Sequence, residues 1–266
     1  MYKKFFEYLI FDPFFLTKNS ISFFYKFFVE RSLKNLFYKK KLDRILNIKK
    51  KNFHKRDVIN EPISKNIKKQ YNPEIIDLAR IYKFIKNEKP FTILEFGVGY
   101  STIVMAQALH ENYLKFDKKK KNKIRNLKMF KIFSVDTSKK WIKNTSNQVP
   151  KHLKKYISFN HSKVKTILYN GEVCHIYEKI PDINPEFIYL DGPHPLDPTG
   201  QVNNISFKCK ERTPISADIC FLESTLLPGT NILVDGRTNN VRFLTRNLKR
   251  KYKIKWDVQS VVNILM

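Results

Sequence analysis

The chain has 266 residues, of which 42% are hydrophobic and 14% aromatic, so it can build a sizeable core. That apolar content excludes global disorder, and only 7 glycines and 12 prolines exclude fibrous and low-complexity classes. The net charge of +27 admits a nucleic acid or an anionic membrane as a partner. The basic residues are 41 Lys and 10 Arg, however, whereas specific readers of phosphates and bases depend on Arg. We therefore favour a compositional bias toward Lys over nucleic-acid binding.

The cysteines and the start of the chain indicate a cytoplasmic location. Cys174, Cys209 and Cys220 form no CxxC pair and no metal-ligand spacing, which fits a reducing compartment. The first residues lack an apolar stretch followed by a small-residue cleavage site, the signature of a signal peptide. The sequence has no window of about 18 uncharged apolar residues, so we expect no transmembrane helix.

Residues 1–70 form a basic, Phe-rich N-terminal extension, with 18 Lys/Arg against 6 Asp/Glu. We predict helices that break at Asp12-Pro13, followed by a linker over 49–70. Basic and aromatic residues mixed at helical spacing suit peripheral contact with an anionic membrane. The alternative, which we favour slightly, is an arm that packs its Phe face on the main domain or on a second subunit.

From residue 71 to residue 266 the chain alternates between strand and helix patterns, which predicts one α/β domain. Asn72-Pro73-Glu74 is a good helix start, and Lys89-Pro90 ends that helix. Asn170-Gly171 predicts the turn of a β-hairpin. The predicted strands are 92–96, 132–136, 163–169, 172–178, 187–191, 231–235, 252–258 and 260–265, and the later helices are 102–110, 138–148, 216–226 and 238–250.

Near-continuous apolar strands that alternate with helices predict a doubly wound, mostly parallel sheet covered on both faces. Three of these strands end in an acid, namely Asp136, Asp191 and Asp235. In an open α/β sheet the ligand crevice lies at the carboxyl ends of the strands. We therefore expect the three carboxylates to converge on one rim.

The strongest local motif is Glu95-Phe-Gly97-Val-Gly99-Tyr-Ser101, between the first strand and its helix. Gly97 and Gly99 let the backbone turn sharply and approach a ligand, and Ser101 is small enough to cap the helix. Position 102 is Thr, so the GxGxxG of a dinucleotide site is incomplete, and no GxxxxGK[ST] phosphate loop occurs. The remaining option is a ligand with a ribose and a zwitterionic tail.

With these motifs the sequence resembles the class I S-adenosylmethionine-dependent methyltransferases, over about residues 72–266 and not over the arm. Residues 95–101 are similar to their first motif, E/D-x-G-x-G-x-G/S. Ser134-Val-Asp136 resembles the second-strand acid, and residues 187–191 and 227–235 resemble the fourth-strand and fifth-strand motifs. The last two strands resemble the antiparallel end of that family's sheet. The resemblance implies S-adenosylmethionine as the cofactor.

By this resemblance, Gly97, Gly99 and Ser101 belong to the cofactor loop, and Glu95 holds the loop near the methionine moiety. Asp136 accepts hydrogen bonds from the two ribose hydroxyls, which a carboxylate can do twice. One departure is the distance of 39 residues from Gly97 to Asp136, where the family has about 20. The excess, Lys115–Lys131, holds nine basic residues and one acid, and we interpret it as an exposed insertion.

The loop Asp191-Gly192-Pro193-His194-Pro195 is the candidate catalytic loop. A His held over the crevice beside a carboxylate suits general-base work on a hydroxyl, so His194 and Asp191 are the candidate bases. The alternative is a loop His that only bonds to the backbone. His161 and His175, in or near the hairpin, more simply satisfy local hydrogen bonds.

The segment Asp235-Gly236-Arg237 follows the fifth strand. Some members of the family hold Mg²⁺ with carboxylates after the fourth and fifth strands, which makes Asp191 and Asp235 the candidate ligands. The neighbouring position that usually carries a second acid or amide is Gly236, which argues against a metal. Arg237 is the candidate substrate-binding residue, since it can bind an acidic acceptor, and the alternative is that it pairs with Asp235.

These features predict an S-adenosylmethionine-dependent O-methyltransferase that acts on a hydroxyl of a small molecule or a glycan. A nucleic-acid methyltransferase is the first alternative, although no NPPY-like or PCQ-like loop follows the fourth strand. A non-catalytic membrane-surface interaction protein on the same fold is the second. The intact glycine loop and the three rim acids argue against it.

Overall fold

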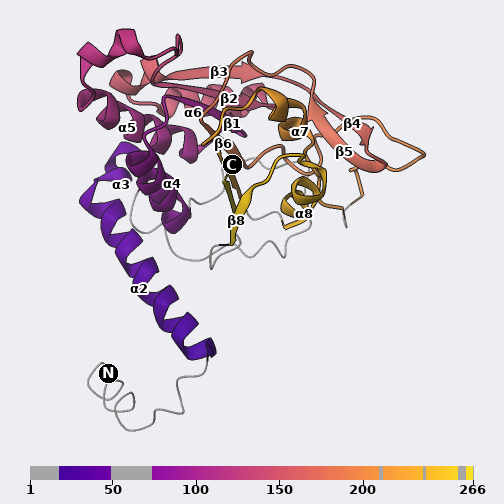
Figure 1. Cartoon of the computed structure of the whole chain (residues 1–266), viewed down its shortest axis with the longest axis horizontal. Helices are drawn as coiled ribbons and strands as arrows, with labels where there is room; N and C mark the ends of the chain where they lie inside the picture. Colours follow the sequence, from indigo (N-terminus) through magenta and orange to yellow (C-terminus); the bar gives the residue numbers. More distant parts are fainter. Residues whose placement is uncertain (1–17, 49–73, 210–211, 236–237, 257–261, 266) are drawn as a thin grey trace.

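This computed structural model describes residues 18–48, 74–209, 212–235, 238–256 and 262–265. A seven-stranded sheet has the order β3-β2-β1-β6-β7-β9-β8, and a two-stranded sheet holds β4 and β5 (Figure 1). The first five strands in that order are parallel, and β9 runs antiparallel to both β7 and β8. The predicted doubly wound, mostly parallel sheet with a closing antiparallel pair is confirmed.

The strands are β1 (Thr92–Phe96), β2 (Lys131–Asp136), β3 (Ile157–His161), β4 (Val164–Tyr169), β5 (Glu172–Tyr177), β6 (Phe187–Leu190), β7 (Asn231–Val234), β8 (Lys253–Trp256) and β9 (Val262–Leu265). The α-helices are α2 (Lys18–Lys39), α3 (Leu42–Ile45), α4 (Ile75–Glu88), α5 (Tyr100–Leu114), α6 (Lys139–Gln148), α7 (Asp218–Leu222) and α8 (Thr238–Asn247). The 3₁₀ helices are η3 (Lys118–Lys123), η4 (Lys151–Tyr156) and η5 (Glu223–Thr225).

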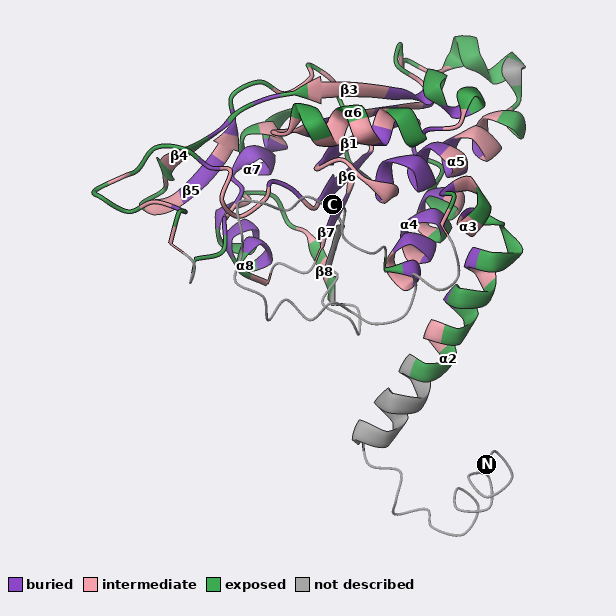
Figure 2. Ribbon diagram, turned by 180° about the vertical axis from the view of Figure 1, so that it is seen from behind, coloured by how far each residue is buried: buried purple, intermediate pink, exposed green. Residues whose placement is uncertain are grey.

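The central strands are buried on both faces because their side chains alternate between two hydrophobic clusters. On β1, Ile93 packs in the cluster with α4 and α5, whereas Leu94 and Phe96 pack in the cluster with α7 and α8. All five residues of β1 are buried, which explains why the strand is mainly apolar in sequence, and its one charged side chain, Glu95, is hydrogen-bonded. Figure 2 shows the buried residues gathered in the sheet and on the helix faces that cover it.

Residues 33–46 of the N-terminal extension contribute to this core. Leu33, Phe37, Leu42 and Leu46 are buried in the cluster that contains the inner face of α4. Towards its start α2 runs away from the domain, and Phe28 is 60% exposed (Figures 1 and 2). The arm therefore packs on the domain through residues 33–46. The predicted break at Asp12-Pro13 and the linker over 49–70 lie outside the described residues.

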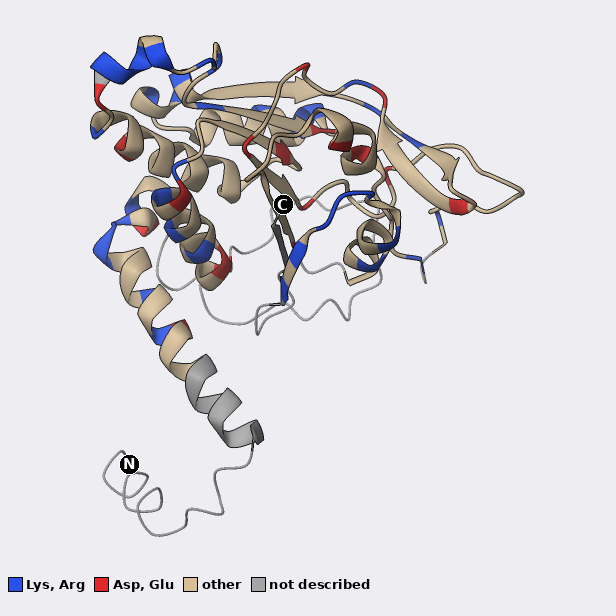
Figure 3. Cartoon of the chain, viewed as in Figure 1, with Lys and Arg blue, Asp and Glu red and all other residues tan. Residues whose placement is uncertain are grey.

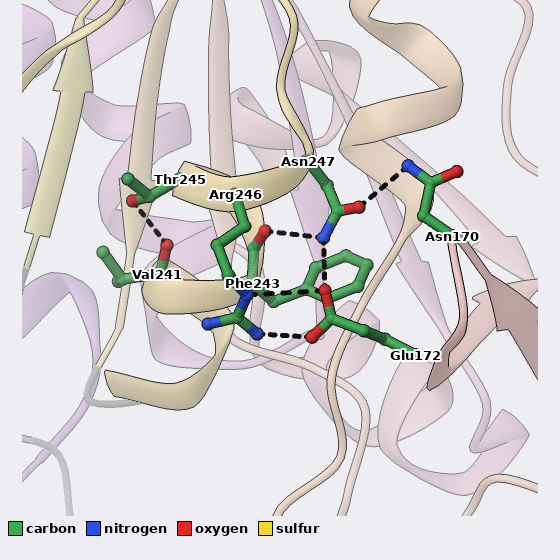
Figure 4. A network of polar contacts seen from close by, with 7 residues as sticks. All are labelled: Asn170, Glu172, Val241, Phe243, Thr245, Arg246 and Asn247. Carbon is green, nitrogen blue, oxygen red and sulfur yellow. Dashed lines mark hydrogen bonds and ion pairs between the residues drawn. The ribbon is translucent and has the colours of Figure 1, made fainter.

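The β4–β5 hairpin stands beside the main sheet and is tied to α8 by polar contacts (Figure 4). Arg246 forms an ion pair with Glu172. The side-chain amide of Asn247 donates to Glu172 Oε1 at 2.8 Å and accepts from Asn170 Nδ2 at 2.9 Å. The hairpin predicted from Asn170-Gly171 is thus present and held in place at its turn.

Several predicted boundaries are wrong, each for a local reason. Strand β3 was not predicted, and it forms one edge of the sheet with only partial burial. The helix predicted over 216–226 is replaced by the shorter α7 and η5, because Ser216 is in an isolated bridge with His175 and its N–H donates to Asn240 Oδ1 at 2.9 Å. Helix α4 begins at Ile75 after an N-cap at Glu74, rather than at Asn72.

Candidate functional site

The register of the parallel strands places the predicted rim residues side by side. Phe96 of β1 pairs with Val135 of β2 and Leu190 of β6, and Leu190 pairs with Val234 of β7. Gly97, Asp136, Asp191 and Asp235 each follow one of these paired residues. The expected convergence of Asp136, Asp191 and Asp235 on the carboxyl edge of the sheet is confirmed.

Glu95 of β1 stabilises the glycine loop through hydrogen bonds at the start of α5. Its side chain is fully buried, and its carboxylate accepts from Ser101 Oγ at 2.6 Å, Thr102 Oγ1 at 2.7 Å and Ser134 Oγ at 2.6 Å. Thr102 Oγ1 also accepts from the N–H of Gly99 at 3.1 Å. Burial raises the pKa of Glu95 to about 7, although the three hydroxyls oppose that rise. Glu95 is therefore a positioning residue that fixes the loop through neighbouring hydroxyl groups.

Ser101 has a different role from the predicted helix cap. The N-cap of α5 is Gly99, and the side chain that bonds to its N–H is that of Thr102. Ser101 is buried, and its hydroxyl group donates a hydrogen bond to Glu95. The cap prediction for Ser101 was wrong because the threonine one position later has the spacing of an N3 residue.

Asp136 holds the same loop from the side. One carboxylate oxygen accepts from the N–H of Val98 at 3.0 Å, and the other accepts from the N–H of Ser138 at 2.7 Å. A carboxylate has about four lone-pair sites, so these two bonds leave capacity for two further donors. Burial, with the negative charges of Asp197 and Asp191, raises the pKa of Asp136 to about 6. The remaining capacity fits the two hydroxyls of a ribose.

The third contact to the loop comes from Gly192, after β6. A Cβ at Gly192 would lie 2.8 Å from the nitrogen and 2.9 Å from the Cα of Gly97. Gly97 itself has φ of +105°, a conformation that favours glycine. Both residues therefore need to be glycine for these two backbones to touch. Sequence analysis did not single out Gly192 as a partner of Gly97, because the two are far apart in the chain.

A general base needs an atom that is able to accept a proton, and the structure bears on this for the two candidates His194 and Asp191. The N–H of Leu196 donates to His194 Nδ1 at 3.3 Å, which leaves the ring proton of the neutral imidazole on Nε2. That tautomer can donate through Nε2 but accepts a proton only after the bond to Leu196 breaks. Asp191 follows β6 directly, and its charge acts on both Glu95 and Asp136. The contact with Leu196 thus occupies the nitrogen of His194 that a base would need.

Asp197 is a rim residue that sequence analysis missed. The hydroxyl of Thr137 donates to its carboxylate, and its charge contributes to the raised pKa of Asp136. The only signal in the sequence is its place in the loop after the candidate catalytic segment. With Asp136, Asp191 and Asp235 it gives the rim negative charge in a chain whose net charge is +27.

The candidate metal and acceptor residues gain no support from the described part of the chain. Within it, no group of three or more His, Cys, Asp or Glu side chains is arranged to hold a metal ion. Asp191 and Asp235 follow neighbouring strands, but Arg237 lies outside the described residues. His161 Nε2 bonds to the carbonyl of Thr137 at 3.0 Å, a local contact as predicted. The ring of His175 is buried beside Phe207.

Comparison with known proteins gives matches to solved structures only. No protein-family model matches the chain, and no curated protein matches it significantly. An O-methyltransferase from Bacillus cereus in complex with SAH covers 71% of this chain and 80% of its own, with 11% identity and a TM-score of 0.41. The O-methyltransferase TomG from Streptomyces achromogenes, involved in tomaymycin synthesis and in complex with SAM, covers 87% and 89%, with 9% identity and a TM-score of 0.40. A putative O-methyltransferase from Klebsiella pneumoniae covers 84% and 89%, with 12% identity and a TM-score of 0.41.

Likeness at this level identifies no activity, so the class of the fold rests on the chain's own strands and loops. The parallel strands, the antiparallel end of the sheet and the glycine loop after β1 are arranged as the resemblance implied. The chain therefore has a doubly wound α/β fold with the strand order and glycine loop that the resemblance led us to expect. Its candidate site lies at the carboxyl edge of β2, β1, β6 and β7.

Proposed function

We propose that this protein is an S-adenosylmethionine-dependent methyltransferase that methylates a hydroxyl of a small molecule or a glycan. The observation that carries the proposal is the glycine loop, which is fixed from three strands by Glu95, Asp136 and Gly192. A loop held this firmly presents its backbone to a ligand without further ordering, and pre-organisation of that kind supports binding.

The residues present fit the proposed cofactor. Asp136 has two lone-pair sites left for ribose hydroxyls, and the paired glycines 97 and 192 keep side chains out of the loop. When bound, the cofactor supplies a methyl group on a positively charged sulfur, which a rim rich in carboxylates attracts. Glu95 is buried and would act on the ligand only through the loop.

For the acceptor side, the proposal assigns the hydroxyl proton to Asp191, with His194 as the second candidate. Holding the acceptor in line with the methyl group would supply most of the rate. The carboxylates of Asp136 and Asp197, whose charges act on each other, support an acceptor without negative charge, because they would repel the phosphates of a nucleic acid. We therefore place a neutral small molecule or glycan ahead of a nucleic acid as the acceptor, and propose no role for Mg²⁺.

Calorimetric titration with S-adenosylmethionine tests the proposal. Wild type should bind, and Gly99→Val should abolish binding because its side chain fills the space under the ligand. The backbone of Gly99 is extended, with φ of −178°, so valine adds bulk there without the strain of a left-handed residue. Absence of both heat and a thermal shift with wild type would reject the methyltransferase proposal.

A further inference from the structure

The insertion between α5 and β2, residues 115–131, packs on the domain through aromatic side chains. The ring of Phe91 packs against those of Phe116 and Phe130, with centroids 5.6 and 5.2 Å apart, and the last two rings are 5.3 Å apart. These aromatic contacts anchor both ends of the insertion on the domain. Since α5 starts at the carboxyl end of β1 and runs back, the insertion lies at the amino ends of the strands, opposite the glycine loop.

A turn near the end of the insertion, over residues 126–128, is held by hydrogen bonds and exposes a leucine. Asn126 Nδ2 donates to Thr92 Oγ1 at 3.0 Å, and the N–H of Lys128 donates to Asn126 Oδ1 at 2.8 Å. Leu127 stands between these two anchored residues and is 103% exposed. A single exposed leucine is ordinary, but here hydrogen bonds on both sides hold the side chain out in solvent. The turn therefore presents Leu127 at a fixed position.

The residues that precede this leucine in the insertion are mostly basic and exposed. We call the following set the insertion surface: Leu127 with Lys119, Lys120, Lys121, Lys123 and Arg125. Within the described part of the chain, none of these five cations makes an ion pair. The nearby carboxylate of Asp117 accepts from the backbone N–H of Lys119 at 3.0 Å. The positive charge of the insertion surface is thus available to an anionic partner.

The neighbouring elements add one exposed apolar residue and one exposed lysine, and they connect the insertion to the end of α2. Leu114, the last residue of α5, is 66% exposed, and Lys115 follows it. Lys86 and Lys40 both lie beside Glu111 of α5, at 3.3 and 3.8 Å. These contacts bring the end of α2 to the start of the insertion, and Figure 3 shows Lys and Arg in the insertion and again around α3, with acidic residues between them.

We propose that the insertion surface docks on an anionic lipid membrane, with Leu127 entering the interface and the lysines meeting lipid phosphates. An exposed apolar side chain among cations suits the boundary of headgroups and acyl chains, where burial and charge both contribute. A nucleic acid would make no use of Leu127, and its specific readers prefer Arg to Lys. Within the described residues no helix is long and apolar enough to cross a bilayer. In this orientation the rim of the sheet faces away from the lipid.

Co-sedimentation of the full chain with phosphatidylcholine vesicles, with and without phosphatidylglycerol, tests the proposal. Wild type should bind only the anionic vesicles and leave them in high salt. Leu127→Ser should weaken binding by about tenfold to a hundredfold, the loss expected for one buried leucine. Changing Lys119, Lys120, Lys121 and Lys123 to Gln should weaken it by about two to three orders of magnitude.

Matched controls separate this surface from the charge of the whole chain. Leu168→Ser removes a leucine that is 55% exposed on the hairpin, and Gln at Lys249, Lys251, Lys253 and Lys255 removes four exposed lysines around β8. Both controls should bind vesicles within a few-fold of wild type. Equal losses in the controls, no binding by wild type, or tight binding to single-stranded RNA with vesicle binding insensitive to Leu127→Ser would each overturn the proposal.

Discussion

Replacing Gly192 by alanine tests whether the glycine loop depends on its contact with the segment after β6. The added Cβ would lie 2.8 Å from Gly97 N, 2.9 Å from Gly97 Cα and 2.8 Å from Tyr177 Oη. Carbon atoms pack best at about 3.5–4.0 Å, so the two backbones must separate by roughly 0.6–1 Å. The φ of Gly192 lies outside the left-handed region, so the effect comes from these close contacts with Gly97 and Tyr177 and not from backbone strain.

The expected cost follows from overpacking at a rigid position. Forcing an extra methyl group into a packed site costs about 1–3 kcal/mol of the free energy of unfolding. For a domain of this size, that lowers the Tm by roughly 2–4 °C for each kcal/mol. A cost of about 1.4 kcal/mol that falls on the loop proposed to contact the cofactor corresponds to a tenfold change in affinity. We therefore expect Gly192→Ala to remain folded, with at least tenfold weaker binding of S-adenosylmethionine in calorimetric titration.

Gly229→Ala is the matched control for Gly192→Ala. Gly229 has φ of +86° and no atom within 4 Å of an added Cβ, so alanine there brings backbone strain without a new contact. That strain costs about 1–2 kcal/mol. The control should lose stability to a similar degree and keep wild-type cofactor affinity. If Gly192→Ala binds the cofactor as wild type does, the loop does not rely on this contact and our explanation is refuted.

Three further predictions concern the carboxylates and the histidine. Asp136→Ala should lower cofactor affinity in calorimetry by one to a few orders of magnitude, because each lost bond to a carboxylate contributes about 1.5–3 kcal/mol; unchanged affinity would contradict its role. Asp191→Asn should lower turnover by about 10²–10⁴, while His194→Ala, whose Nδ1 accepts from Leu196, should lower it less than tenfold, and the reverse order would make His194 the base. Burial raises the pKa of Glu95 from 4.5 to about 7, so the folded state binds this proton more tightly and the free energy of unfolding should fall as pH rises from about 4.5 to 7. Thermal melts across that range should show a flatter pH dependence for Glu95→Gln, and identical slopes would contradict the assignment.

The sequence predicted strand bounds best where a strand is buried on both faces of the sheet. Strand β1 was predicted with its observed bounds, because a strand covered on both faces is mostly apolar, here with Ile93, Leu94 and Phe96. Strand β3 escaped prediction because it lies at the edge of the sheet, where Ile157 and Phe159 alternate with polar residues over only five positions. The early end of α8 at Asn247 also has a tertiary cause, since Glu223 accepts from the N–H groups of Lys249 and Arg250.

The candidate site was predictable as a set of residues but not as a set of contacts. The motif and the strand ends identified Glu95 and Asp136, since both follow local patterns. That both carboxylates hold the glycine loop depends on which strands are neighbours, which one sequence does not reveal. The contact between Gly97 and Gly192 is the clearest case, because it joins β1 to the loop after β6.

The glycine loop and the turn that carries Leu127 lie at opposite ends of the sheet and are held by different contacts. We therefore expect substitutions in one to leave the other unaffected. At the carboxyl end, the glycine loop is held by Glu95 of β1, Asp136 of β2 and Gly192 after β6, so it exists only when all three strands are paired. At the amino end, the turn that carries Leu127 is held by its own neighbour Asn126 and by Thr92. Within the part of the chain that the structure describes, the two sets of contacts have no residue in common. Distant sites without shared partners give additive effects, usually within about 0.3–0.5 kcal/mol. Leu127→Ser should therefore leave cofactor affinity unchanged, Gly192→Ala should leave vesicle binding unchanged, and the double variant should show both losses at their single-variant size. A double variant that loses more than the two together would mean that the membrane surface and the rim communicate through the sheet.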